Sequence, residues 1–115
     1  MKKELKSTGI PLDEILLREW SDPKRARFVI KLALEEFEED NDLEALLDTL
    51  RLVAKAQGGL AKLARKASVS RQALHEALSS KGNPRLRTFK NVIECLGLRI
   101  AIEPLKSPVK LARAA

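Results

Sequence analysis

Two short segments with helical periodicity, residues 60–66 and 70–78, are separated by only three residues centred on Ser68. A connection this short makes the two helices cross at a steep angle. The chain has 115 residues, of which 44% are apolar and only 3% are aromatic, so a single core of helices packed on helices is expected. The sequence therefore predicts an all-α domain built around a tight helix pair.

Individual side chains suit that steep crossing. Ala64 is small where the two helices meet, and Val69 fills the turn between them. Leu74 and Leu78 recur at the spacing that holds one face of the second helix on a core. Ser70 follows the turn as a natural N-cap, so the second helix is expected to start there.

Arg71, Gln72 and His75 then lie on the outward side of the second helix, near its N-terminus. This arrangement matches the helix-turn-helix, whose second helix enters the major groove of DNA at its N-terminal part. Arginine donates two hydrogen bonds to guanine, and glutamine pairs similarly with adenine. We interpret these three residues as candidate DNA base-reading positions; the alternative is an ordinary solvated surface.

Basic and neutral hydrogen-bond donors surround these positions. The candidates for DNA phosphate binding are Lys62, Arg65, Lys66, Ser70, Ser79, Ser80, Lys81, Asn83, Arg85 and Arg87. Contacts to phosphates position a protein on the duplex without reading its sequence. Each of these side chains taken alone is equally consistent with simple exposure to solvent.

Helical periodicity also predicts elements on either side of the pair. Long helices are expected at about 23–39, 42–57 and 86–96, and residues 12–20 have room for one or two short helical turns. Asp22 is placed to cap the first long helix. Asn41 or Asp42 can cap the next. Trp20 and the three Phe are expected to be packing anchors, with Phe28 and Leu32 widening the apolar face of the first long helix, and Cys95 is expected to be a small buried residue.

Residues 98–103 alternate apolar and other side chains, which is the pattern of a β-strand. Leu98, Ile100 and Ile102 would share one face. A single strand needs a partner for its backbone, and the simplest partner is its copy in a homodimer. The alternative is a strand-like segment laid over the helices of its own chain.

Charge is divided along the chain. Residues 1–50 carry 8 Lys/Arg against 13 Asp/Glu, whereas residues 51–115 carry 14 against 3. A half with net charge +11 favours a polyanionic partner, and a half with net charge −5 favours a basic one. The acidic residues cluster at Glu35, Glu36, Glu38, Glu39 and Asp40, which lack the residue order of a calcium-binding loop.

Several classes of function are disfavoured. No apolar run approaches a membrane span and the N-terminus has no signal core, so a cytoplasmic protein is expected. One Cys and one His cannot supply a zinc site, and no nucleophile and orienting group surround His75. We expect no metal, no cofactor and no enzymatic activity.

The order of an acidic segment, a Leu-rich helix, the stretch Leu60-Ala61-Lys62-Leu63-Ala64, Ser70-Arg71, then Gly82-Asn83-Pro84 and Leu96-Gly97-Leu98 resembles the addiction-module antidote proteins. These are HigA-like antitoxins with a Xre/Cro-type DNA-binding domain. The resemblance spans roughly residues 10–103. It implies a five-helix, lambda-repressor-like helix-turn-helix domain with one C-terminal strand. Ser68 is a departure, because such turns usually carry glycine at a positive φ.

The resemblance further implies a dual role: neutralising a basic RelE/ParE-like toxin and repressing the operon as a dimer bound to operator DNA. Residues 1–41 would then form the arm and acidic helix that bind the toxin, with Glu35, Glu36, Glu38, Glu39 and Asp40 as contacts. Residues 42–104 would form the DNA-binding domain with its strand. Residues 105–115 would be a disordered basic tail.

Two alternatives remain at this point. The first is a stand-alone Xre-type repressor without a toxin partner. The second is an RNA-binding module or small nuclease, which is disfavoured because few aromatic residues are available to stack on bases and a single His offers little for phosphodiester chemistry.

Overall fold

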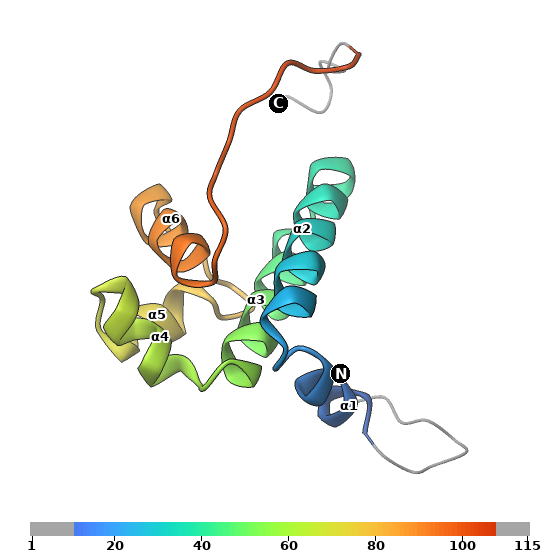
Figure 1. The fold of residues 1–115 in the computed structure, drawn as a ribbon. Coiled ribbons are helices and arrows are strands. Elements are labelled where there is room, and N and C mark those ends of the chain that lie inside the picture. Colours follow the sequence, from blue (N-terminus) through green and yellow to red (C-terminus); the bar gives the residue numbers. More distant parts are fainter. Residues whose placement is uncertain (1–10, 108–115) are drawn as a thin grey trace.

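The computed structural model describes residues 11–107, and this part of the chain is all-helical (Figure 1). Its helices are α1 (Leu12–Glu19), α2 (Pro23–Asp40), α3 (Leu43–Ala56), α4 (Leu60–Ala67), α5 (Arg71–Ala77) and α6 (Leu86–Cys95). The five predicted helices are confirmed to within a few residues. The short turns expected at 12–20 are a complete helix, so the described chain has six helices rather than five.

Helix α3 lies at the centre of the arrangement. It packs against α1 and α2 on one side and contacts α4 on the other, while α4 in turn packs against α5 and α6. Figure 1 shows α1 and α2 on one side of α3 and the α4–α6 group on the other. The acidic and basic halves of the sequence therefore occupy different sides of one molecule.

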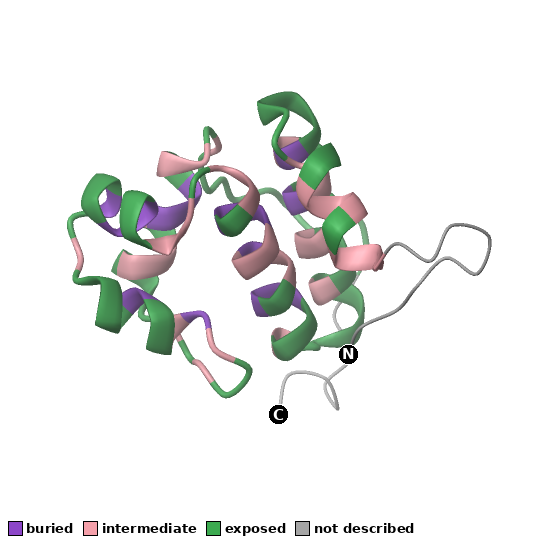
Figure 2. Cartoon of the chain, turned by 90° about the horizontal axis from the view of Figure 1, so that it is seen from below, coloured by how far each residue is buried: buried purple, intermediate pink, exposed green. Residues whose placement is uncertain are grey.

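A single hydrophobic core joins these two sides. Buried residues face inward from each of the helices α2 to α6, as Figure 2 shows. Ile30 of α2, Leu47 of α3, Leu74 of α5 and Ile93 of α6 all belong to the same buried cluster. Trp20, Phe37 and Phe89 pack against this cluster while partly exposed, which confirms them as packing anchors.

Side-chain caps fix where the long helices begin. One Asp22 carboxylate oxygen accepts a hydrogen bond of 3.2 Å from the Lys24 backbone amide at the start of α2. One Asp42 oxygen accepts a bond of 3.1 Å from the Ala45 amide at the start of α3. Asn41 ends α2 in the left-handed conformation with φ of 56°, and asparagine tolerates this conformation. Asp42 rather than Asn41 is therefore the cap of α3.

Three predicted burials are wrong. Phe28 is 63% exposed and Leu32 is 39% exposed, because the opposite face of α2 carries Ala26 and Ile30 into the core. Helix α2 packs mainly on α3, so its apolar residues cannot all be covered. Cys95, expected to be buried, is half-buried at the edge of the core.

The predicted C-terminal strand is absent from the described residues. Residues 98–105 have no regular secondary structure, and Figure 1 shows this segment leaving the helices after α6. Leu98 packs partly against the core, but Ile100 and Ile102 are exposed. The physical reason is that the described chain offers no second strand to pair with the segment. Most of the predicted basic tail, residues 108–115, lies outside the described range.

Candidate nucleic-acid interface

The connection between α4 and α5 is a tight turn built on Ser68. Ser68 has φ of 59° and ψ of 40°, so the left-handed backbone expected for this position is confirmed. The Val69 amide donates a hydrogen bond of 3.1 Å to the Ala64 carbonyl oxygen, which closes the end of α4. The turn therefore redirects the chain within three residues.

Buried side chains hold the two short helices together. Ala64 and Ala67 of α4 and Leu74 and Leu78 at α5 are almost completely inaccessible to solvent, as the sequence predicted for Ala64, Leu74 and Leu78. Val69 packs against the same core while partly exposed. Small residues on α4 allow the two helices to approach closely. Leu74 of α5 and Leu78 at its end then fill the space between them.

Two long-range hydrogen bonds anchor the pair to its neighbours. Arg51 of α3 donates a hydrogen bond to the Leu78 carbonyl oxygen at the end of α5. Asn91 of α6 donates one of 3.3 Å from its side-chain nitrogen to the Ala67 carbonyl oxygen at the end of α4. Both acceptors are helix-terminal carbonyl groups that have no partner within their own helix. These contacts fix the C-terminal ends of the two short helices.

Helix α5 presents its N-terminal residues to solvent. The Ser70 hydroxyl oxygen accepts a hydrogen bond of 3.0 Å from the Ala73 amide, so Ser70 is the N-cap that the sequence predicted. Arg71, Gln72 and His75 are all exposed. These three side chains are therefore accessible from solvent, and base reading stays a prediction.

Glu76 is a residue on this surface that the sequence analysis missed. Gln72 Nε2 donates a hydrogen bond of 3.1 Å to Glu76 Oε1, and both side chains are exposed. The spacing of four residues on one helix is the signal that could have found it. A carboxylate therefore stands among the residues proposed to face DNA.

A groove between α3 and α5 adds a second group of missed residues. Its volume is about 450 Å³, and Arg51 and Lys55 of α3 line it together with Arg71 and His75 of α5. Asp48 is the acidic residue of the lining and pairs with Arg51 at 2.8 Å. Lys55 could not be found from local sequence, because only the fold makes residues of α3 and α5 line one groove.

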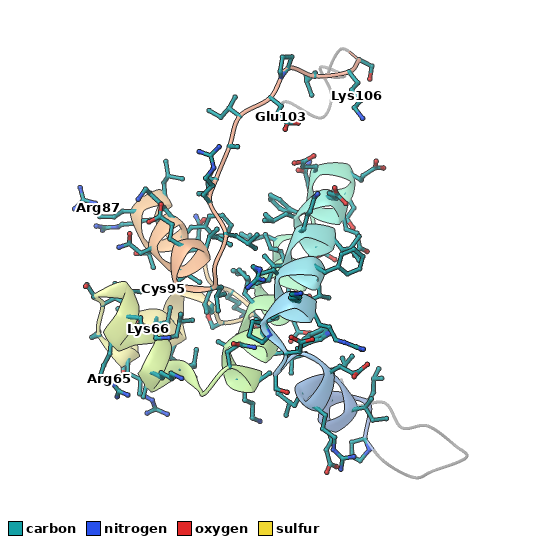
Figure 3. All side chains as sticks on the ribbon, viewed as in Figure 1. Arg65, Lys66, Arg87, Cys95, Glu103 and Lys106 are labelled. Atoms are coloured by element: carbon teal, nitrogen blue, oxygen red, sulfur yellow. The ribbon has the colours of Figure 1, made fainter. Side chains whose placement is uncertain are left out.

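The candidate phosphate-binding residues are spread over the α4–α6 side of the molecule. Those that are exposed are Lys62, Arg65 and Lys66 on α4, Ser70 before α5, Ser80, Lys81, Asn83 and Arg85 in the following loop, and Arg87 on α6. Ser79 is half-buried, and its hydroxyl donates a hydrogen bond of 2.8 Å to the Glu76 carbonyl oxygen. Figure 3 shows Arg65 and Arg87 extending from α4 and α6 away from α1 and α2.

The acidic residues lie elsewhere, at the C-terminal end of α2. Glu35, Glu36, Glu38, Glu39 and Asp40 are all exposed there. Four of them, with Leu32, surround a shallow recess of about 440 Å³, whereas Glu38 lines a separate cavity between α2 and α6. The structure thus separates the two groups that the sequence assigned to different partners.

Comparison with known proteins identifies the family. A family described as "Probable addiction module antidote protein" matches residues 20–104, which is well over half of the chain. The chain belongs to this family. Membership supports an antitoxin role in a toxin–antitoxin module, with a toxin as partner.

One curated relative is similar to the chain. An uncharacterized protein of Haemophilus influenzae is 34% identical to this antidote family member over 74 residues, which cover 64% of the chain and 75% of the relative. No solved structure matches the chain. The antidote assignment therefore comes from sequence.

Two properties of residues 11–107 bear on other functions. No group of three or more His, Cys, Asp or Glu side chains there is arranged to hold a metal ion. Within the same residues, no helix combines the length and apolar character that crossing a bilayer requires.

Proposed function

We propose that this chain is a HigA-like antitoxin with a Xre/Cro-type, lambda-repressor-like helix-turn-helix. In this proposal it neutralises a RelE/ParE-like toxin and represses its own operon by binding operator DNA. The observation that carries the DNA-binding part is the exposure of Arg71, Gln72 and His75 at the capped N-terminal end of α5, directly after the tight Ser68 turn. The toxin-binding part extends the antidote family to which the chain belongs.

On the DNA side, α5 is the helix proposed to enter the major groove. Its first two residues, Arg71 and Gln72, have the side chains that discriminate guanine and adenine, at about 1–3 kcal/mol for each good pair. His75 lies one turn further along the same helix. The rigid attachment of α5 through Leu74 and Leu78 supports this role, because a base-reading helix must keep a fixed orientation.

The phosphate contacts are proposed on both flanks of α5. Lys62, Arg65 and Lys66 come from α4, Ser70 and Ser79 from the ends of α5, and Lys81, Asn83, Arg85 and Arg87 from the loop and the start of α6. Neutralising phosphates releases counterions, so binding should weaken steeply with added salt.

On the toxin side, residues 1–41 are proposed to supply the contacts, with Glu35, Glu36, Glu38, Glu39 and Asp40 facing a basic partner. Residues 42–104 form the proposed DNA-binding region. The described parts of both regions share one hydrophobic core, so they are two surfaces of one folded unit. A toxin that cleaves RNA needs a cationic surface, which is the complement of the acidic end of α2.

A homodimer is also part of the proposal. Ile100 and Ile102 are 43% and 96% exposed on a segment whose backbone has no strand partner in the described chain. Pairing residues 98–103 with their copy would satisfy the backbone and cover Leu98, Ile100 and Ile102 on one face. Two α5 helices in a dimer would read two half-sites of an operator.

The test of DNA binding compares two alanine variants on duplexes carrying the promoter of the chain's own operon and on random duplexes. Arg71→Ala should relax specificity at one operator position, while Lys62→Ala should weaken binding to every sequence alike. Equal effects of both variants on both kinds of duplex would contradict the placement of α5 in the groove. Stronger binding to RNA than to duplex DNA would favour an RNA-binding module.

The test of toxin binding uses the product of the gene adjacent to this one. The two proteins should co-purify as a complex, and co-expression should restore growth to cells producing the toxin. DNA binding without such a complex would make the chain a stand-alone repressor.

A further inference from the structure

Helix α2 carries an apolar patch that faces solvent. Phe28 is 63% exposed and Leu32 is 39% exposed, whereas the other three aromatic residues of the chain pack against the core. A spacing of four residues places Phe28 and Leu32 side by side on one face of the helix. An exposed aromatic beside an exposed leucine is the residue composition found at the centre of protein interfaces.

The same face becomes acidic toward the end of the helix. Glu35 and Glu39 follow Phe28 and Leu32 at helical spacing, so the four residues form one stripe along α2. Leu32, Glu35 and Glu39 also line the shallow recess of about 440 Å³ at this end of the helix. The stripe therefore begins with the apolar residues Phe28 and Leu32 and ends at the acidic, shallow recess.

These carboxylates are unfavourable for the isolated fold. The last turn of α2 contains no basic residue, and negative charge at a helix C-terminus opposes the helix dipole. Within residues 11–107, neither Glu35 nor Glu39 forms an ion pair with Lys or Arg. A cationic surface placed against this end of α2 would offset the unfavourable interaction with the helix dipole. It would also supply the ion-pair partners that Glu35 and Glu39 lack.

We infer that the stripe Phe28, Leu32, Glu35 and Glu39 is the docking surface for a cationic protein, with Phe28 inserted into an apolar recess of that partner. This inference rests on the proposed function, since the partner is the toxin. It adds to that function by naming Phe28 as the residue that anchors the complex. Buried aromatic anchors dominate the lifetime of complexes, whereas charges at the rim govern the rate of encounter. Phe28 and the two glutamates therefore have separable effects.

The position of the stripe separates its acidic end from the proposed DNA surface. Helix α2 packs mainly on α3, and Figure 1 shows the end of α2 pointing away from α4 and α5. The acidic end of the stripe therefore lies away from Arg71 and Gln72 on α5.

The experiment measures association and dissociation rates between the full chain and the purified product of the adjacent gene. Phe28→Ala should increase the dissociation rate by about tenfold or more and leave the association rate almost unchanged. The control is Leu86→Ala, since Leu86 is 75% exposed on α6 outside the stripe. That variant should behave as the wild type, and both variants should keep the wild-type melting temperature because both side chains are exposed.

A charge-neutralised pair completes the test. Glu35→Gln with Glu39→Gln should slow association several-fold and flatten its dependence on salt. The control, Glu44→Gln with Glu94→Gln, changes two exposed glutamates outside residues 1–41 and should change little. Wild-type kinetics for Phe28→Ala, or equal losses for Leu86→Ala, would overturn the inference while leaving the proposed function intact. Dissociation of a homodimer by Phe28→Ala, without loss of the complex, would overturn it in favour of a second copy. If the wild-type chain does not bind this protein at all, the proposed toxin partnership fails and the inference fails with it.

Discussion

Gln72 and Glu76 face solvent one turn apart on α5, and Gln72 Nε2 donates a hydrogen bond of 3.1 Å to Glu76 Oε1. A carboxylate can only accept hydrogen bonds, so the amide nitrogen of Gln72 is oriented by this contact. Pairing with adenine needs both the nitrogen and the oxygen of that amide. Gln72 keeps a second amide N–H and its oxygen, so pairing with adenine in the proposed complex does not require the contact with Glu76 to break.

The first prediction concerns this pair. Glu76→Gln removes a negative charge that faces the phosphates, so affinity for random duplex should rise by about twofold to fivefold at low salt. Fluorescence anisotropy with a labelled duplex measures the change. The matched control is Glu44→Gln, an exposed glutamate in the first turn of α3, which should leave affinity unchanged. An unchanged affinity of Glu76→Gln for every duplex would show that α5 does not approach the phosphates.

The second prediction assigns Lys55 to the DNA surface. Lys55 lines the groove between α3 and α5 together with Arg71, so it should contact a phosphate when α5 is in the groove. Lys55→Gln should reduce the slope of log affinity against log salt by about one, for operator and random duplexes alike. Titrations at four or five salt concentrations measure the slope. Lys24→Gln, an exposed lysine at the start of α2, is the control whose slope should not change.

The third prediction concerns strain in the turn. Ser68 has φ of 59°, and this backbone is unfavourable for a residue with a Cβ atom. Ser68→Gly should therefore raise the free energy of unfolding by about 1 kcal/mol, partly offset by the greater entropy of glycine in the unfolded chain. Urea denaturation measures it. Ser68→Ala keeps the Cβ atom and should give no gain; stabilisation by both variants would point to loss of the hydroxyl group instead.

The fourth prediction concerns Gly82, which lies against the end of α5. A Cβ atom there would stand 2.2 Å from the Ala77 carbonyl oxygen and 2.8 Å from the Glu76 oxygen, both of which are backbone atoms. Gly82→Ala should lower the free energy of unfolding by about 2–3 kcal/mol, since backbone must move to admit the methyl group. Chemical denaturation measures the loss.

A second glycine provides the comparison for Gly82. Gly59 has φ of 97°, but a Cβ atom there would meet nothing within 4 Å. Gly59→Ala should therefore cost only the backbone strain of a conformation essentially restricted to glycine, about 1–3 kcal/mol. A loss at Gly82 no greater than that at Gly59 would mean that the loop accommodates the side chain by shifting away from α5.

Local patterns were sufficient to predict the helices and their caps. Asp22, Asp42 and Ser70 act within three residues of their own position, so their role is visible in sequence. The same holds for the Ser68 turn and for Leu74 and Leu78, whose burial follows from helical spacing. The exposure of Arg71 and Gln72 follows from that burial, because the opposite face of a short helix must face solvent.

Exposure of apolar residues could not be predicted in this way. Phe28 and Leu32 fit an apolar helix face, yet only the number of neighbours around α2 decides how wide a face can be buried. The strand at 98–103 failed for a related reason, since alternation marks a segment able to pair while pairing requires a second strand. The place of Lys55 could not be predicted either, because only the folded chain makes α3 and α5 line the same groove.

The sequence by itself determined that this chain is helical, where its helices begin and end, and which residues form the tight α4–α5 turn, because hydrogen bonds and periodicity act over three or four residues. Only the tertiary structure decided that Phe28 stays exposed, that Lys55 joins Arg71, and that the acidic end of α2 points away from α5. Those outcomes depend on which helices pack together, and packing is a property of the whole chain rather than of any short segment.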